Sequence, residues 1–166
     1  MIYQEENKVY QIDCTNAVWS TDQINAIYHR ATASLLSDVD FVVETEKDIV
    51  FVEYKNANIP NASSPESFQP SSDKSISKIA RKYYDSLLYV LACDYSKCNK
   101  YVYILEYPKG DKITRKLIRD KIVAKLPFKL NSEAKVAKSL ISDFQVLSID
   151  EWNSSAEFRN FPISKI

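Results

Sequence analysis

Two acidic residues and a lysine stand at the ends of two short apolar stretches of this chain. Asp40 comes directly before Phe-Val-Val, and Glu53 and Lys55 follow the apolar run of residues 49–52. Successive side chains of a strand point to opposite faces, so Glu53 and Lys55 share one face. A hairpin closed by a turn at residues 45–47 brings Asp40 level with Glu53. The sequence therefore predicts two carboxylates and one ammonium group gathered at one end of an apolar ribbon.

This cluster points to a particular kind of chemistry. The apolar run before Glu53 predicts a strand that is buried on both faces. A buried charge is costly unless it is paired or binds a metal ion. Divalent cations such as Mg²⁺ take oxygen ligands, typically one or two carboxylates together with water and substrate phosphate. A lysine beside the ion can orient or deprotonate a water molecule and stabilise a developing negative charge.

The elements that must position these groups are predicted from apolar periodicity and from capping residues. A first helix is expected to begin at Ser20, where Ser20 and Gln23 form a capping box, and to bury an apolar stripe that ends at Leu35 and Leu36. The other expected elements are a leading strand over 8–14, the hairpin over 39–55, a helix over 75–95, a strand over 101–107, a helix over 112–126, a short helix over 132–142, a strand over 144–149 and a last short helix capped by Asp150. The helix over 112–126 is expected to turn its apolar side chains inward, namely Ile113, Leu117, Ile118, Ile122 and Leu126. This order predicts a single α/β domain over residues 1–166, with a mixed sheet flanked by helices.

Residues 56–73 form a polar loop that is rich in serine, asparagine and proline and has no periodicity. Loops of this length are uncommon in compact domains and are usually functional or mobile. Because the loop leaves directly from the strand that carries Glu53 and Lys55, it is expected to be mobile and to lie over the site. The alternatives are a functional loop, which is either a lid or a nucleic-acid contact, and a loop that is simply disordered.

Composition excludes several classes of protein. The chain has one glycine, which excludes the glycine-rich phosphate loops of nucleoside triphosphatases and the dinucleotide-binding fingerprint. It has three cysteines without a repeated spacing, so free or buried thiols are expected and no disulfide framework. No apolar run is long enough to cross a membrane, and the acidic N-terminus lacks a signal region, which predicts a cytoplasmic protein.

Charge is balanced overall but unevenly distributed. The chain carries 22 basic and 22 acidic residues. Residues 1–66 hold 11 acidic and 4 basic residues, whereas residues 109–138 hold 10 basic and 3 acidic ones. This asymmetry favours an acidic metal site together with a separate basic surface for a polyanion. The alternative is an ordinary solvated helix face that is rich in lysine.

Asp40, followed by Glu53-Tyr54-Lys55 at the end of an apolar strand, resembles the core motif of the PD-(D/E)xK nuclease superfamily. Val39 stands where the motif name has proline. The resemblance covers about residues 20–107, and its value comes from the strand context and from the aspartate 13 positions before the glutamate. It implies a restriction-endonuclease-like αβββαβ core, provided that one core strand is short or comes from residues 144–149.

The resemblance also implies roles for the residues that match the motif. Asp40, Glu53 and the backbone carbonyl of Tyr54 would hold one or two Mg²⁺ or Mn²⁺ ions, and Lys55 would position the attacking water. Asp38 competes with Asp40 for the metal, but Asp40 matches the spacing better. In this superfamily the second core helix often places a basic side chain near the scissile phosphate. The candidates for that contact are Lys78 and then Lys82.

The first core helix of the superfamily often contributes an acid, and in some branches a histidine, to the metal. Asp22 and His29 are the candidates in this chain. A structural alternative exists for each residue. Asp22 can be an acid in the first turn of a helix, where the helix dipole favours negative charge, and His29 can be a surface or packing histidine.

The function implied is a metal-dependent nuclease, with DNA favoured over RNA and internal cleavage favoured over cleavage from an end. Double-strand cutting with one site per chain would call for a homodimer. The candidate nucleic-acid-binding residues are basic, namely Lys82, Lys112, Arg115, Lys116 and Arg119. One alternative is a catalytically inactive protein of the same fold that binds nucleic acid or protein. The other is that Asp40, Glu53 and Lys55 merely form a surface ion-pair cluster, which would contribute little.

Overall fold

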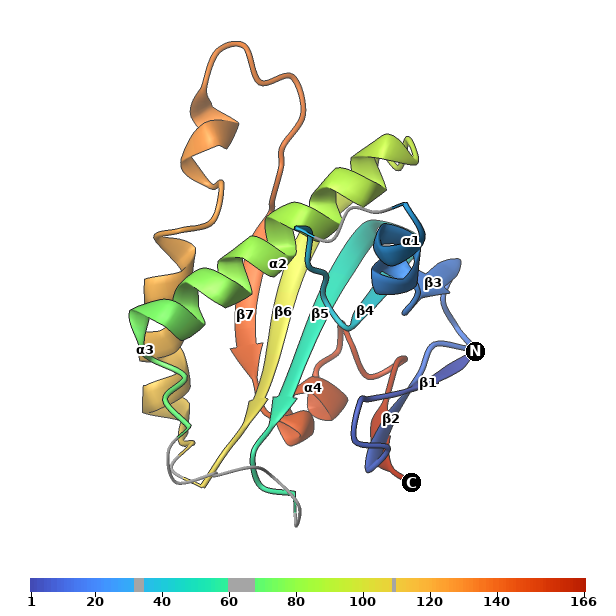
Figure 1. Cartoon of the computed structure of the whole chain (residues 1–166), viewed down its shortest axis with the longest axis vertical. Helices are drawn as coiled ribbons and strands as arrows, with labels where there is room; N and C mark the ends of the chain where they lie inside the picture. Colours follow the sequence, from blue (N-terminus) through green and yellow to red (C-terminus); the bar gives the residue numbers. More distant parts are fainter. Residues whose placement is uncertain (32–34, 60–67, 109) are drawn as a thin grey trace.

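A computed structural model describes residues 1–31, 35–59, 68–108 and 110–166 of the chain (Figure 1). These residues form a mixed α/β structure. Its elements in chain order are β1 (Ile2–Gln4), β2 (Tyr10–Asp13), β3 (Trp19–Thr21), α1 (Ile24–Arg30), β4 (Phe41–Glu44), β5 (Asp48–Asn56), α2 (Asp73–Ala92), β6 (Cys98–Glu106), α3 (Lys112–Val123), a 3₁₀ helix (Lys129–Ser132), β7 (Asp143–Leu147), α4 (Ile149–Ser154) and β8 (Ile163–Lys165).

Two sheets organise the described residues. The larger sheet has the strand order β3-β4-β5-β6-β7, and the smaller one has the order β1-β2-β8. In the larger sheet β3, β4 and β5 pair antiparallel, whereas β5, β6 and β7 pair parallel. A parallel pair needs a long crossover connection, and α2 supplies it between β5 and β6. The predicted mixed sheet is therefore present, and the smaller sheet was not predicted.

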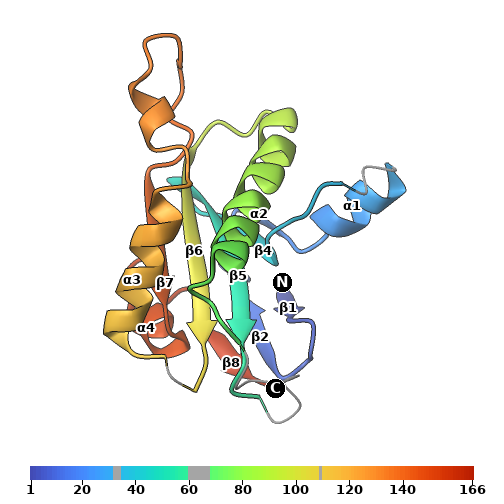
Figure 2. The same ribbon diagram turned by 60° about the vertical axis from the view of Figure 1, so that its left-hand side comes forward.

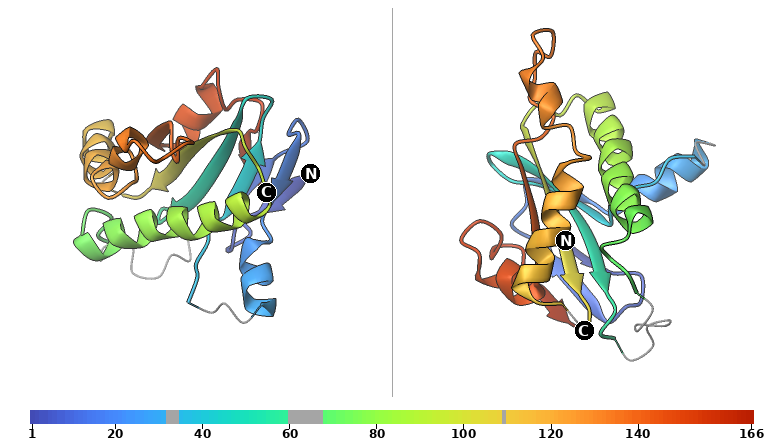
Figure 3. Two further views of the ribbon diagram at one scale, coloured as in Figure 1. Left: turned by 90° about the horizontal axis from the view of Figure 1, so that it is seen from above. Right: turned by 90° about the vertical axis from the view of Figure 1, so that its left-hand side faces the viewer.

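The larger sheet is covered on both faces, as its continuous apolar strands require. One face packs against α2 and α3 in a core that includes Ile49 and Phe51 of β5. The other face packs against α4 and the small sheet, through Val50 and Val52 of β5. Figures 2 and 3 show α2 and α4 on opposite sides of the sheet, with α3 beside β7. Because β5 lies in the middle of this sandwich, charged groups on it are enclosed unless they stand near its end.

The hairpin that carries the acidic residues forms as the sequence predicts. β4 and β5 pair antiparallel around the turn at residues 45–47, with Phe41 opposite Val52. The next pair in this register is Asp40 and Glu53, so the two carboxylates stand at the same level. The apolar side chains fix this register, because a slip by one residue would move them all to the opposite face.

Polar contacts tie the segment before β4 to α2. The backbone N–H of Val39 donates to Ser86 Oγ at 2.9 Å, and this bond is buried. Asp85 accepts hydrogen bonds from the backbone N–H and the hydroxyl of Ser37. The Tyr28 hydroxyl donates to the Asp85 carbonyl oxygen, which also ties α1 to α2. These contacts fix the backbone next to Asp40 against the helix that covers the sheet.

The first helix differs from its prediction. It begins at Ile24, with Gln23 as its N-cap, because residues 19–21 form β3 and pair with β4. Ser20 lies buried in that strand and forms no capping box. Leu35, expected on the buried stripe, lies outside the helix and is 82% exposed. Pairing with a strand that comes later in the chain overrides the local helical pattern, as tertiary contacts often do.

The third helix buries a different face from the one predicted. Ile118 and Ile122 face the core as expected, but Ile113 and Leu117 are exposed and Arg115 is buried in their place. Arg115 can be buried because its guanidinium lies 3.0 Å from the Glu151 carboxylate of α4.

Two further predictions near the C-terminus are wrong. Residues 132–142 form turns after the 3₁₀ helix and no α-helix. The last helix is capped by Ser148, in a capping box with Glu151, and Asp150 lies inside its first turn. A serine followed three residues later by glutamate is the usual signature of such a box.

The remaining expectations concern thiols, membranes and the polar loop. Cys14, Cys93 and Cys98 are free, as expected. No helix in the described part of the chain is long and apolar enough to cross a bilayer. The centre of the expected loop over 56–73 lies outside the described residues.

Replacing Ser86 with alanine tests how firmly α2 holds the segment before β4. The variant leaves the buried N–H of Val39 without an acceptor, so the free energy of unfolding should fall by about 1–3 kcal/mol in urea titrations. Ser77→Ala, at an exposed position of the same helix, should stay within about 0.5 kcal/mol of the unmodified protein. Equal stability of the two variants would contradict the role of Ser86.

Candidate functional site

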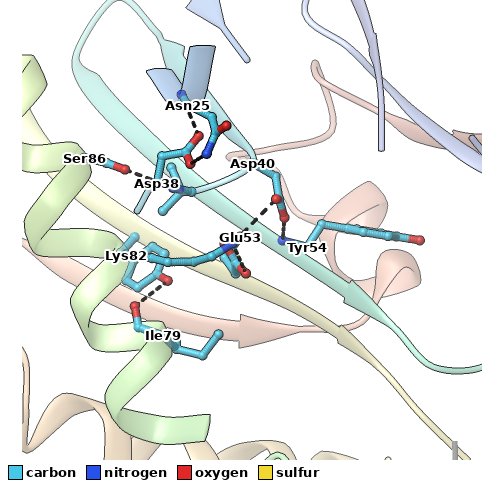
Figure 4. A network of polar contacts seen from close by, with 10 residues as sticks. Asn25, Asp38, Asp40, Glu53, Tyr54, Ile79, Lys82 and Ser86 are labelled. Atoms are coloured by element: carbon cyan, nitrogen blue, oxygen red, sulfur yellow. Dashed lines mark hydrogen bonds and ion pairs between the residues drawn. The ribbon is translucent and has the colours of Figure 1, made fainter. Parts of the chain in front are cut away.

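Asp40 and Glu53 meet near the C-terminal end of β5, and Figure 4 shows their side chains turned toward one another. Asp40 stands just before β4, and its Oδ2 accepts a hydrogen bond of 2.7 Å from the Tyr54 backbone N–H. Glu53 lies on the face of β5 that α2 covers, and its side chain is only 7% exposed. The Asp40 side chain is 35% exposed. The pair therefore combines one enclosed carboxylate with one that reaches solvent.

Lys82 of α2 joins the two carboxylates. Its Nζ donates to Glu53 Oε1 at 2.7 Å and to Oε2 at 2.8 Å, and it lies 3.7 Å from Asp40 Oδ1. Because both distances are measured from Lys82 Nζ, Asp40 Oδ1 and Glu53 Oε1 are separated by no more than 6.4 Å. This separation brings both carboxylates within reach of one divalent cation and its bound water. A surface ion-pair cluster does not describe the site, because Glu53 and Lys82 are largely enclosed.

Burial dominates the electrostatics of this group. It raises the pKa of Glu53 to about 8, and the neighbouring charge of Asp40 adds to the rise, whereas Lys82 opposes it. Burial also raises the pKa of Asp40, while Lys82 and the Tyr54 amide limit that rise. Burial alone would lower the pKa of Lys82, but Glu53 and Asp40 outweigh it and the pKa rises. The pKa of each carboxylate thus stays above its ordinary value, even with Lys82 between them.

A cavity of about 810 Å³ opens beside the carboxylates. Its floor includes Asp40, Glu53 and Tyr103, and the first turns of α2 form one wall. Both ends of the polar loop also line it, through residues 56, 57, 59, 68, 69 and 72. The described ends of the loop therefore border the site, and residues 60–67, which the expectation of a loop over the site concerns, lie outside the described part of the chain.

Lys55 and Lys78 both line this cavity. Lys55 is exposed at the end of β5, on the same face as Glu53, and its Nζ lies 6.0 Å from the centre of the Phe68 ring. Lys78 is exposed one turn before Lys82 on α2. Neither lysine forms an ion pair with a carboxylate of the described residues. Both lysines therefore add positive charge to the lining of the cavity.

The other acidic and histidine candidates lie away from the pair or have different partners. Asp38 accepts hydrogen bonds from the backbone N–H and the side-chain amide of Asn25 (Figure 4). It therefore holds the start of α1, and Asp40 is the aspartate beside Glu53. Asp22 accepts a hydrogen bond from Gln23. Neither Asp22 nor His29 lines the cavity.

The candidate nucleic-acid-binding residues divide into two groups. Lys112 and Lys116 of α3 are exposed. Lys82, Arg115 and Arg119 have partners within the fold: Lys82 at the carboxylates, Arg115 at Glu151, and Arg119 at the Phe144 carbonyl oxygen, to which its Nε donates at 2.9 Å. Residues 109–138 thus offer less positive charge to a ligand than their composition suggests, because Arg115 and Arg119 are used within the fold.

Three features of the site were not predicted. The first is the position of Lys82 between the carboxylates, because it was expected at the phosphate and not at the acidic pair. The second is Tyr103 of β6, which pairs with Glu53 in the parallel register and lines the cavity. The third is Glu6, which lines the cavity from the turn between β1 and β2 and whose charge adds to the pKa rise of Asp40. Only the alternation along β6 could have suggested Tyr103, and no local signal marks Glu6.

The donor set suits a hard divalent cation that is held by few protein ligands. Among the described residues, no group of three or more His, Cys, Asp or Glu side chains could hold a metal ion. Mg²⁺ commonly binds proteins through one or two carboxylates and keeps several waters. Asp40 and Glu53 supply this number of carboxylates, and the Tyr54 backbone passes directly beside them.

Comparisons with models of known protein families, with curated proteins and with solved structures found no match to this chain.

The raised pKa of Glu53 predicts a pH-dependent stability in the absence of metal. Between its ordinary value of 4.5 and about 8, the folded state keeps a proton that the unfolded state loses. The stability that this proton contributes is complete below 4.5 and disappears as the pH rises through 8. Relative to Glu53→Gln, the unmodified protein should therefore lose stability across this range, by at most about 1.4 kcal/mol per pH unit. Urea titrations in EDTA at pH 5, 6, 7 and 8 measure the difference, and a constant difference would contradict the shift.

Proposed function

We propose that this protein is a Mg²⁺- or Mn²⁺-dependent nuclease that hydrolyses phosphodiester bonds, with DNA as the favoured substrate. One observation carries the proposal. Asp40 and the enclosed Glu53 both lie within ion-pair distance of the Lys82 ammonium group, beside a cavity that is also lined by Lys55 and Lys78. Two carboxylates close enough to share one positive charge, with lysines beside them, suit a divalent ion that is bridged to a phosphate.

The proposal gives the residues of the cavity distinct roles. Asp40 and Glu53 would hold the cation, with the Tyr54 carbonyl oxygen as a further ligand. A bound Mg²⁺ or Mn²⁺ would lower the pKa of a coordinated water and stabilise charge on the phosphate. Lys55, exposed on the same face of β5 as Glu53, would orient that water. Lys78 would contact the phosphate from the opposite wall of the cavity.

The arrangement of elements supports a restriction-endonuclease-like core with one departure. α1, β4, β5, α2 and β6 follow each other in the order that the resemblance implies, with Asp40 just before β4 and with Glu53 and Lys55 near the end of β5. The remaining core strand would be the short β3, which pairs with β4. β3 precedes α1 in the chain, whereas in the αβββαβ order the helix comes first.

A second candidate function is a binding protein of the same fold without catalysis. The position of Lys82 favours it, because an ammonium group already neutralises part of the charge that would attract a metal. The retention of Asp40, Glu53 and Lys55 together opposes it. Affinity for Mg²⁺ or Mn²⁺ at Glu53 distinguishes the two functions.

Incubation with supercoiled plasmid, single-stranded DNA and RNA tests the proposal directly. Cleavage of one or more substrates is expected with Mg²⁺ or Mn²⁺ and none with EDTA. Asp40→Asn and Glu53→Gln should both lose the activity. Nicked or linear plasmid would indicate internal cleavage. Complete absence of cleavage under all metal conditions, with a folded protein, would favour the binding protein.

Lys55→Ala should lower the rate of cleavage by about 10²–10⁴-fold, since it removes the group that orients the water. Binding of an uncleaved oligonucleotide in Ca²⁺ should change by less than about threefold. Lys47→Ala is the matched control, because Lys47 is exposed in the turn at the other end of the same strand. A Lys55→Ala protein that cleaves as fast as the control would refute this role.

The exposed lysines of α3 should contribute to binding through phosphate contacts. Each lysine that contacts a duplex phosphate adds about 0.9 to the slope of log affinity against log salt concentration. Replacing Lys112 and Lys116 with alanine should therefore make binding weaker and less dependent on salt, as measured by fluorescence anisotropy. Lys165→Ala, on the small sheet, should leave the slope unchanged. An unchanged slope in the double variant would place the nucleic acid elsewhere.

A further inference from the structure

Lys82 stands where a cation would be expected between Asp40 and Glu53 (Figure 4). It contacts both oxygens of Glu53 and approaches Asp40, and its own side chain is only 16% exposed. Among the described residues, Lys82 is the one hydrogen-bond partner of the Glu53 carboxylate. A divalent ion that is bound through Glu53 would therefore compete with Lys82 for the same two oxygens.

We propose that Lys82 is a built-in counter-ion that competes with the divalent cation and makes cation binding depend on a phosphate in the cavity. This inference rests on the proposed nuclease function, and it assigns Lys82 a positioning role rather than a chemical one. Without substrate, the ammonium group neutralises the carboxylates and keeps cation affinity low. With a phosphodiester present, Lys82 turns to the phosphate and releases Glu53 to the cation.

The surroundings of Lys82 allow this exchange. The residue lines the same cavity as Lys55 and Lys78, so a phosphate bound there would lie near all three ammonium groups. A lysine side chain is a flexible four-carbon chain with a compact charge, and it can move between two anionic partners without leaving its helix position. The Asp40 carboxylate, in contrast, is held by the Tyr54 amide, and the backbone of Glu53 is held in β5. Lys82 has the longest side chain of the three residues, so we expect its ammonium group to make the larger movement.

The exchange implies a thermodynamic coupling between the two ligands. If a phosphate raises the affinity for the cation by some factor, the cation must raise the affinity for the phosphate by the same factor. The coupling would keep the site free of tightly bound metal until a substrate arrives. Lys78 should not show this effect, because it forms no ion pair with either carboxylate although it lies one turn away on the same helix.

Binding of Mn²⁺ alone, followed by the electron paramagnetic resonance signal of the free ion, tests the competition. Lys82→Met should bind Mn²⁺ at least tenfold more tightly than the unmodified protein. Lys82→Arg keeps the charge and should bind as weakly as the unmodified protein. Lys78→Met should change the affinity less than Lys82→Met does, and Lys47→Met, at an exposed position outside the cavity, should change it by less than threefold. Circular dichroism establishes that each variant is folded.

A second measurement tests the coupling to phosphate, and its first part uses only the unmodified protein. Dimethyl phosphate, a minimal phosphodiester, should tighten Mn²⁺ binding at least threefold, and the factor should be smaller in Lys82→Met. Equal Mn²⁺ affinity in Lys82→Met and the unmodified protein, or no effect of dimethyl phosphate, would overturn the role of Lys82 and leave the metal site in place. Absence of Mn²⁺ binding in every protein, or unchanged binding in Glu53→Gln, would overturn the proposed nuclease instead.

Discussion

The burial of the Glu53 carboxylate near the end of a central strand is the constraint around which the site is arranged. A carboxylate removed from water needs a partner of opposite charge, and Lys82 supplies it from α2. Even so, burial leaves the pKa of Glu53 far above its ordinary value. A buried ion pair is weak evidence for stability, because a well-packed apolar pair of similar volume is often as stable or more so. Stability alone therefore does not explain the position, and under the proposed function the carboxylate is placed there to bind a cation.

The same constraint accounts for the contacts that hold Asp40. A second carboxylate at this place raises the cost of the first, so its backbone must be fixed for the pair to persist. Ser86 and Asp85 of α2 hold the residues just before Asp40, and the Tyr54 amide holds its carboxylate. Residues from β4, β5 and α2 thus depend on one another. The acidic pair is a product of tertiary structure, although both acids are recognisable in the sequence.

Features encoded by local patterns were predictable from the sequence. The β4–β5 hairpin follows from two apolar runs around a polar turn, and its register follows from the apolar face. α2 follows from its helical apolar periodicity. With the hairpin in place, the meeting of Asp40 and Glu53 follows from residue counting alone. The pattern of these two strands is therefore sufficient to locate the acidic pair.

Features that depend on distant partners were not predictable. β3 exists because it pairs with β4, whereas Ser20 was expected to cap the first helix. Arg115 is buried because Glu151 comes to it from α4, 36 positions later in the chain. The ion pair of Lys82 depends on how α2 is rotated against β5, which periodicity fixes only approximately. In each case a charged residue or a strand contacts a partner far away in the sequence, so no local pattern predicts the contact.

The distribution of charge around the cavity follows from these long-range contacts. Two arginines that composition assigns to a polyanion-binding surface are used inside the fold, by Glu151 and by the Phe144 carbonyl oxygen. Three further lysines line the cavity near the carboxylates, namely Lys55, Lys74 and Lys78, and none of them forms an ion pair within the described part of the chain. A polyanion that approached two carboxylates alone would be repelled, and nearby lysines offset this repulsion. Under the proposed function, these lysines bring the phosphate to the acidic pair, and the basic helix α3 contributes the more distant contacts.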